Sequence, residues 1–431
     1  MKGEINVKTN EMIELIRSGT YDEIFLKTYM DKEKVASQKY RYIKAIDNFR
    51  VSFADADIEI YSAPGRSEIG GNHTDHQHGK VLAASINKDA IAVVEKIEEP
   101  YVEVISKGYD KLRIELDDLS KKEDEKETTI ALIRGVLSKV KDSGFKVGGF
   151  KAYVTSDVLI GAGLSSSAAF ETLIGTIVSN LYNDGKITAV DIAIIGQYAE
   201  NEYFGKPCGL MDQMACSVGS LVNIDFEDVN KPKVERVECD LESHGFSLCI
   251  TDTKGSHADL TSDYAAIPEE MKSVARCLGK DVLGNVTKRD ILNNITEIRK
   301  KVSDRALLRA LHYVCENERV EKEVEALKNN QFSEFLALVK ESGDSSYKYL
   351  QNVFTCNDIE HQNVSIALAV SEMVLGKNGL CRVHGGGFEG TIQAFVPNNL
   401  VKEYKEAMDE IFGKDACDVM KIRKYGGIRI L

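Results

Sequence analysis

The chain has 431 residues, of which 43% are hydrophobic, and its formal net charge is −13. This length is sufficient for two domains that each bury a hydrophobic core. A nucleic-acid-binding protein would instead show a clustered excess of Lys and Arg. The composition therefore indicates a globular protein with no nucleic-acid partner, and it favours a small-molecule ligand.

The N-terminal sequence, the hydrophobic runs and the cysteine spacing indicate the cellular compartment. The N-terminal segment carries too many charges for a secretory signal, and no run of about 18 uncharged apolar residues occurs. The nine cysteines are scattered and include no CxxC pair, which is typical of reduced cytosolic thiols. We expect a cytoplasmic protein that does not span a membrane.

The first part of the chain combines helices with short strands. Residues 10–50 have a helical pattern, and we expect residues 1–55 to form an N-terminal helical cover. Four β-type segments follow, separated by polar or Gly-containing turns. They predict an antiparallel or mixed sheet and lie at residues 58–62, 90–96, 101–106 and 112–116.

A strand, a glycine-rich turn and a helix follow one another near the middle of the chain. Phe150, Ala152 and Val154 alternate as in a half-buried strand. The turn GAGLSSSAA begins at Gly161, and apolar residues then recur every four positions from Ala169, as on one face of a helix.

The remaining pattern predicts a second domain. Further helices and strands continue to the C-terminus, and a charged stretch at 235–245 is the predicted boundary. The predicted domains are residues 56–240 and 241–431.

The glycine-rich turn has the parts of an anion cradle: glycines, hydroxyls and the N-terminus of a helix. It contains no lysine, so it is not a Walker A loop. A triphosphate would fit this loop, and the alternative is a purely structural helix cap. The predicted ATP-binding residues are Gly161, Ala162, Gly163, Leu164, Ser165, Ser166, Ser167 and Ala168.

A second polar segment, GRSEIGGNHTDH, runs from Gly65 to His76. It gathers an arginine, an amide, imidazoles and carboxylates, a set of donors and acceptors that suits a polyol such as a sugar. Two alternatives remain open. One is a plain polar turn, and the other is a metal site built on His73, Asp75, His76 and His78.

Two more segments contain candidate functional residues. Residues 200–213 end in GKPCGLMDQ, where Asp212 follows a Cys-Gly turn and opens a short helix. Residues 382–390 read RVHGGGFEG between two apolar segments. Taken singly, they would be a helix N-cap and a wide hairpin turn.

In this order, from about residue 57 to the C-terminus, the four motifs resemble the GHMP kinase superfamily and, within it, the galactokinases. GRSEIGGNHTDHQHG looks like the galactokinase signature, and GAGLSSSAAFE looks like the ATP-phosphate loop. GKPCGLMDQ looks like the segment that bears the catalytic aspartate, and GGGFEG like the glycine motif that closes over the phosphates. The resemblance implies a two-domain α+β fold, with mixed sheets flanked by helices and the active site between the domains.

The resemblance also implies an activity: ATP-dependent phosphorylation of the anomeric hydroxyl of a hexose, most directly galactose. Asp212 would be the catalytic carboxylate with Arg66 as its partner, and Ser167 and Glu200 would hold Mg²⁺. Phosphoryl transfer needs such a metal and a group that accepts the hydroxyl proton. The implied sugar-binding residues are Asn72, His73, Asp75, Gly209 and Tyr264.

Several positions depart from the galactokinase pattern, among them Asn72, His76, Leu159 and Glu389. Asn72 stands where the family has a glutamate towards C6 of the sugar. Its neutral side chain would remove a repulsion of about 4 kcal/mol against a C6 carboxylate at about 4 Å and an effective dielectric of about 20. Galacturonate is therefore an alternative substrate.

A kinase-derived sensor that binds ATP and sugar to recruit a partner protein is the alternative of another class. Relatives of that kind tend to have a damaged SSSAA loop. Here residues 165–169 are intact and Asp212 is present, which favours an enzyme.

Overall fold

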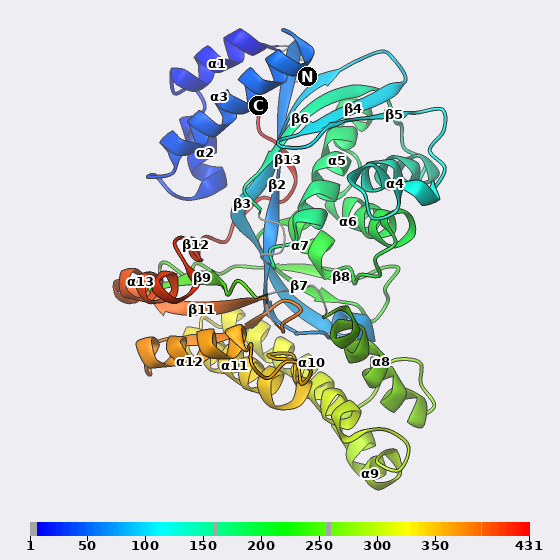
Figure 1. The fold of residues 1–431 in the computed structure, drawn as a ribbon, viewed down its shortest axis with the longest axis vertical. Coiled ribbons are helices and arrows are strands. Elements are labelled where there is room, and N and C mark those ends of the chain that lie inside the picture. Colours follow the sequence, from blue (N-terminus) through cyan, green and yellow to red (C-terminus); the bar gives the residue numbers. More distant parts are fainter. Residues whose placement is uncertain (1–6, 159–162, 256–259, 389) are drawn as a thin grey trace.

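The computed structural model describes residues 7–158, 163–255, 260–388 and 390–431. Within these ranges the strands form one nine-stranded and one four-stranded sheet, and helices pack on both (Figure 1). The predicted α+β class with mixed sheets is confirmed.

The nine-stranded sheet is centred on two long antiparallel strands, β2 (Asp57–Gly70) and β3 (Lys80–Lys96). Both contain a predicted β segment, but both are much longer than predicted. Among the described strands of this sheet, β4 and β6 are the one parallel pair. Its other strands are β1 (Val7–Lys8), β4 (Tyr101–Ser106), β5 (Lys111–Glu115), β6 (Phe150–Ser156), β7 (Leu221–Asp225), β8 (Lys233–Val237) and β13 (Ile428–Arg429).

Helices cover both faces of this sheet because successive side chains of a strand point to opposite faces. Tyr61 and Val94 face the core beneath the first group of helices, whereas their neighbours Ile60 and Val93 face the core beneath the second. The first group is α4 (Thr129–Asp142), α5 (Ser166–Asn183) and α6 (Ala189–Tyr198). The second is α1 (Thr9–Arg17), α2 (Asp22–Tyr29) and α3 (Val35–Phe53).

A buried carboxylate joins the N-terminal helices to the sheet. Asp89 is fully buried and accepts hydrogen bonds from Tyr29 Oη at 2.9 Å, Arg41 Nη1 at 2.6 Å and Arg423 Nη1 at 3.0 Å. Removing one partner of such a buried pair costs about 3–5 kcal/mol. The N-terminal cover is therefore an integral part of the fold, and it lies on the face of the sheet opposite α5 (Figure 1).

The four-stranded sheet has the antiparallel order β10–β11–β9–β12. Strands β10 (Leu380–His384) and β11 (Thr391–Pro397) form the predicted hairpin, with His384 opposite Thr391. The other two strands are β9 (Phe246–Asp252) and β12 (Cys417–Met420). The helices of this half are α8 (Thr261–Cys277), α9 (Lys288–Ile298), α10 (Asp304–Lys328), α11 (Phe332–Ser345), α12 (Asn363–Leu375) and α13 (Val401–Phe412).

The chain passes from the large sheet to the small one between β8 and β9, the region that contains the predicted boundary. Strand β13 returns to the large sheet, where Ile428 lies opposite Ser62 of β2. The division into residues 1–55, 56–240 and 241–431 stays a prediction.

Among the helices of the described ranges, none is long and apolar enough to cross a membrane. All nine cysteines lie within those ranges, and each is a free thiol.

Candidate active site

Arg66 and Asp212 form a bidentate ion pair. Arg66 lies in β2 directly after a register shift at Pro64, and Asp212 lies in the first turn of α7 (Met211–Val218). Nε of Arg66 donates to Oδ1 of Asp212 at 2.6 Å, and Nη2 donates to Oδ2 at 2.8 Å. A guanidinium that binds both oxygens fixes the plane of the carboxylate.

The surroundings of Asp212 keep it ionised. Burial alone would raise its pKa, but the charge and hydrogen bonds of Arg66 and the hydroxyl of Ser165 outweigh burial and lower the pKa below its ordinary value. Ser165 Oγ donates to Oδ2 at 2.6 Å. The Asp212 side chain remains 30% exposed. At neutral pH it is therefore an oriented carboxylate that a ligand can reach.

The predicted phosphate loop, residues 161–168, contacts the strand that carries Arg66 through Gly163 and Leu164. The Arg66 backbone N–H donates to the Leu164 carbonyl at 3.1 Å, and Nη1 donates to the Gly163 carbonyl. Gly163 has a φ of +65°, and a Cβ there would lie 2.5 Å from Thr391 Oγ1, so this position requires glycine. Gly161 and Ala162 lie outside the described residues.

Helix α5 begins directly after this turn. Ser165 precedes the helix, and Ser166, Ser167 and Ala168 form its first turn. The backbone N–H groups of a helix N-terminus attract anions. The strand, turn and helix that we predicted around the loop are thus present.

Ser167 and Glu200 are in contact. Ser167 Oγ donates to Glu200 Oε1 at 3.1 Å, and Glu200 is only 3% exposed. Glu200 lies in a π-helical segment, Ala199–Phe204, that continues α6. Sequence reasoning missed Gln213, whose Nε2 donates to Glu200 Oε2 at 2.8 Å and to Glu171 Oε2 at 3.1 Å. Burial and the Glu200 charge raise the pKa of Glu171 well above its ordinary value.

Asp75 and Gly209 lie side by side. Asp75 opens a 3₁₀ turn, Asp75–Gln77, in the signature loop, which we define as residues 71–79. A Cβ added to Gly209 would lie 1.8 Å from Asp75 Oδ2, so only glycine allows this approach. Two of the predicted sugar-binding residues, distant in sequence, are thus adjacent.

His73 and Tyr264 both contact the glycine hairpin, which we define as residues 385–388 between β10 and β11. His73 Nε2 lies 3.2 Å from the Gly386 carbonyl, and Tyr264 Oη donates to the Gly387 carbonyl at 3.0 Å. Burial and then the neighbouring His76 lower the pKa of His73 to about 3. The ring is therefore neutral, and Nε2 carries the hydrogen that the carbonyl accepts.

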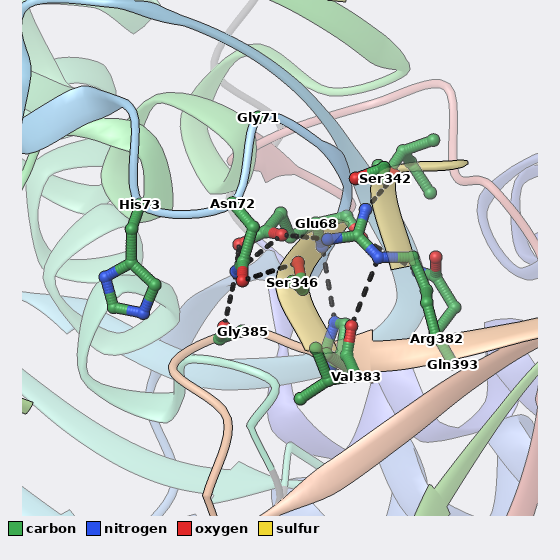
Figure 2. Close-up of polar contacts among 12 residues, drawn as sticks. Glu68, Gly71, Asn72, His73, Ser342, Ser346, Arg382, Val383, Gly385 and Gln393 are labelled. Carbon is green, nitrogen blue, oxygen red and sulfur yellow. Dashed lines mark hydrogen bonds and ion pairs between the residues drawn. The ribbon is translucent and has the colours of Figure 1, made fainter. Parts of the chain in front are cut away.

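Asn72 differs from the expectation that its side chain faces the sugar. It is fully buried, and Figure 2 shows it turned away from the His73 ring, towards Glu68 and Ser346. Nδ2 donates to both carboxylate oxygens of Glu68 at 2.9 and 3.0 Å, and to the Gly385 carbonyl at 2.7 Å. Because protein groups use both amide hydrogens, this arrangement does not support direct sugar contact by Asn72.

The sequence pattern did not reveal the groups around Asn72. Arg382 Nη2 donates to Glu68 Oε1 at 2.8 Å, and Asn352 Nδ2 donates to Asn72 Oδ1 at 2.8 Å. Ser346 Oγ adds a contact of 3.3 Å to the same oxygen. These partners lie about 275 residues or more beyond Asn72, so no local spacing could have identified them.

The metal site considered for the signature loop is not supported. Across the described residues, no three His, Cys, Asp or Glu side chains gather as they would around a metal ion. The His73 and His76 rings instead stack with centroids 6.2 Å apart. Leu159 and Glu389, two departures from the galactokinase pattern, lie outside the described residues.

Comparisons with known families match these regions. The family described as "GHMP kinases N terminal domain" matches residues 131–220, and "Galactokinase galactose-binding signature" matches residues 47–96. A galactokinase of Actinobacillus pleuropneumoniae serotype 5b (strain L20) is 30% identical over 86% of this chain and 93% of its own length. The chain belongs to the galactokinase family.

Other relatives agree with that assignment. A galactokinase of Clostridium tetani (strain Massachusetts / E88) is 27% identical over 84% of this chain and 90% of its own length. The solved structure of Lactococcus lactis galactokinase complexed with galactose has a TM-score of 0.76, 23% identity, and covers 89% of this chain and 98% of that one. A mevalonate kinase structure matches with a TM-score of 0.56 over 84% of this chain and 99% of its own, at 17% identity. The predicted GHMP kinase fold is confirmed, and membership of this family makes the protein a sugar kinase that uses ATP.

Proposed function

We propose that this galactokinase-family protein transfers the terminal phosphoryl group of ATP to the anomeric hydroxyl of galactose. The bidentate Arg66–Asp212 pair carries the proposal. The pair lies where the phosphate loop meets the segment 200–213, since Ser165 of the loop also donates a hydrogen bond to the Asp212 carboxylate. A carboxylate in this position can act on the hydroxyl of one substrate while the loop holds the phosphates of the other.

Asp212 accepts the hydrogen bond of the attacking hydroxyl. Its lowered pKa makes it a weak base, so it receives the proton late, as bonding to phosphorus develops. Before that point it orients the hydroxyl for in-line attack. Arg66 fixes the carboxylate and adds positive charge near the phosphoryl oxygens.

Ser167 and Glu200 fit a Mg²⁺ ion. They offer one hydroxyl and one carboxylate, the oxygen ligands that Mg²⁺ prefers when phosphates supply the rest. Gln213 holds the second oxygen of Glu200, so the first remains directed towards Ser167. When bound, the ion would neutralise phosphate charge during transfer. Lys206, with Nζ 3.5 Å from Glu200 Oε1, adds a further positive charge.

Asp75, Gly209, His73 and Tyr264 remain the proposed sugar-binding residues, because they adjoin one another or the glycine hairpin. Galactose is favoured over galacturonate. The curated relatives are galactokinases, and the galacturonate alternative rested on Asn72, whose side chain is buried. The intact Arg66–Asp212 pair favours an enzyme over the alternative of a kinase-derived sensor protein.

We further propose that the protein acts in the cytoplasm on these two small molecules. The free thiols support this location.

The direct experiment is ADP release from MgATP across galactose, galacturonate, glucuronate, glucose and N-acetylgalactosamine. Galactose should give the highest kcat/KM. Equal ADP release with and without sugar would reject the proposal.

A further inference from the structure

The carbonyl groups of the three glycines in the glycine hairpin, Gly385, Gly386 and Gly387, are held by side chains from other parts of the chain. Asn72 Nδ2 donates to the Gly385 carbonyl at 2.7 Å. His73 Nε2 and Asn352 Nδ2 lie 3.2 and 3.3 Å from the Gly386 carbonyl, and Tyr264 Oη donates to the Gly387 carbonyl at 3.0 Å. Three consecutive peptide groups are therefore oriented from outside the hairpin.

Orienting a carbonyl also orients the next N–H group. Every described peptide bond is trans, so the N–H of the following residue points away from the carbonyl before it. Fixing the carbonyls of Gly385 and Gly386 thus fixes the N–H groups of Gly386 and Gly387. The hairpin lies beside the phosphate loop, since a Cβ added to Gly385 would lie 3.9 Å from the Gly163 carbonyl.

Asn72 is the best fixed of these donors. Its Oδ1 accepts from Asn352 Nδ2 at 2.8 Å, and its backbone carbonyl lies 3.0 Å from His312 Nε2. Its other amide hydrogen is held by Glu68, which Arg382 binds in turn (Figure 2). A fully buried amide whose oxygen and both hydrogens have partners is held firmly, so it can hold the Gly385 carbonyl in a fixed position.

We infer that Asn72 is a positioning residue: its amide clasps the signature loop to the glycine hairpin and aligns the hairpin's N–H groups for the nucleotide phosphates. This inference rests on the proposed function for the identity of the ligand that the hairpin meets. If it holds, Asn72 affects kcat and the KM for MgATP. Asn72 then does not determine the preference between galactose and a sugar with a C6 carboxylate.

Asn72→Asp is the sharpest variant because it keeps the shape and replaces the donor nitrogen by oxygen. Asn48→Asp is the matched control, since Asn48 donates to Tyr153 Oη at 3.1 Å in the N-terminal cover. We expect Asn72→Asp to lower kcat about tenfold or more and to raise the KM for MgATP. The ratio of kcat/KM for galactose to that for galacturonate should stay within about twofold of the parent. A loss of folded protein alone would lower kcat and leave both KM values unchanged.

The double variant Glu68→Gln/Asn72→Asp separates the two roles of the amide. In this variant residues 68 and 72 again supply one carboxylate and one amide, but the Gly385 carbonyl still lacks its hydrogen-bond donor. We expect it to recover thermal stability without recovering kcat. Recovery of full activity would overturn the clasp, as would a tenfold change in the sugar ratio with an unchanged KM for MgATP.

Hydrogen–deuterium exchange tests the clasp without any activity measurement. Residues 385–388 should exchange faster in Asn72→Asp than in the parent and in Asn48→Asp. If Asn72→Asp does not fold, Asn352→Asp must show the same faster exchange, because Asn352 holds both Asn72 and Gly386. Unchanged exchange in the folded variant would reject the inference. A parent that shows the clasp but phosphorylates no sugar would reject only the proposed function.

Discussion

The guanidinium of Arg66 binds both carboxylate oxygens of Asp212, at 2.6 and 2.8 Å. The contact joins a strand of the large sheet to the first turn of α7, 146 residues apart. It keeps Asp212 both ionised and fixed in direction, which is what a carboxylate needs to hold a hydroxyl for in-line attack.

Asp212→Asn should leave a folded protein that turns over at least about 100-fold more slowly, because the substitution keeps the shape and removes the charge that acts on the hydroxyl proton. Steady-state kinetics with MgATP and galactose, together with a thermal melt, measure this. Turnover within threefold of the parent would remove Asp212 from the reaction.

Ser165→Ala should lower kcat about tenfold, since a hydrogen bond to a charged group contributes about 1.5–3 kcal/mol. Ser165 is one of the groups that lower the pKa of Asp212, so its loss raises that pKa. Because the proposed reaction uses ionised Asp212, the acid limb of the plot of kcat against pH should move to higher pH.

Ser371→Ala is the matched control, as Ser371 is a buried serine of α12 whose hydroxyl bonds Ala367 and Tyr404. An unshifted acid limb would contradict the role of Ser165.

Ser167→Ala and Glu200→Gln should each raise the Mg²⁺ concentration required for half-maximal activity, because the first removes a proposed hydroxyl ligand and the second removes the negative charge of a proposed carboxylate ligand. Titration of activity with Mg²⁺ at fixed ATP measures this, and galactose affinity should change far less. Glu202→Gln is the control, as Glu202 is an exposed glutamate of the same π-helical segment. If all three variants had the parent's Mg²⁺ dependence, neither Ser167 nor Glu200 would be a metal ligand.

Glu68 should make stability depend on pH. Burial raises its pKa from the ordinary value of 4.5 to about 7, and the charges of Arg382 and Arg66 and the hydrogen bond from Asn72 only partly offset burial. A raised pKa means that the folded protein holds the proton more tightly than the unfolded chain. The tighter proton binding stabilises the folded protein by up to about 3 kcal/mol. This stabilisation is complete below pH 4.5 and is lost as the pH rises through about 7.

Urea unfolding of the parent and of Glu68→Gln at pH 5 and pH 8 measures this linkage. The free energy of unfolding of the parent should fall more steeply with pH than that of the variant. Equal slopes would mean that Glu68 does not titrate in this range.

Sequence and structure agree where the information is local. The turn that begins α5 and the short helix at Asp212 are predicted from glycine, hydroxyl and acidic residues within a few positions, and both are present. The predicted N-cap role of Asp212 is wrong, because Leu210 is the N-cap of α7 and Asp212 lies within its first turn. The surroundings of Asn72 could not be predicted this way. Its partners Asn352 and Gly385 approach it only after the second half of the chain has packed against the first.

The lengths of the two central strands show the same limit. Residues 58–62 have an obvious strand pattern, but β2 continues to Gly70 because β3 pairs with it beyond the register shift at Pro64. Arg66 therefore belongs to a strand, although its segment reads as a polar turn. Pairing between strands, and not local preference, places Arg66.

Phosphorylation of the anomeric hydroxyl of galactose is the reaction that we propose for this chain. ³¹P and ¹³C NMR of a reaction containing MgATP and galactose labelled at C1 tests it most directly. We predict one product whose C1 resonance is split by phosphorus, formed in proportion to ADP and absent with Asp212→Asn. ADP formed without a C1–O–P linkage, or a higher kcat/KM with galacturonate than with galactose, would show that galactose 1-phosphorylation is not the reaction of this protein.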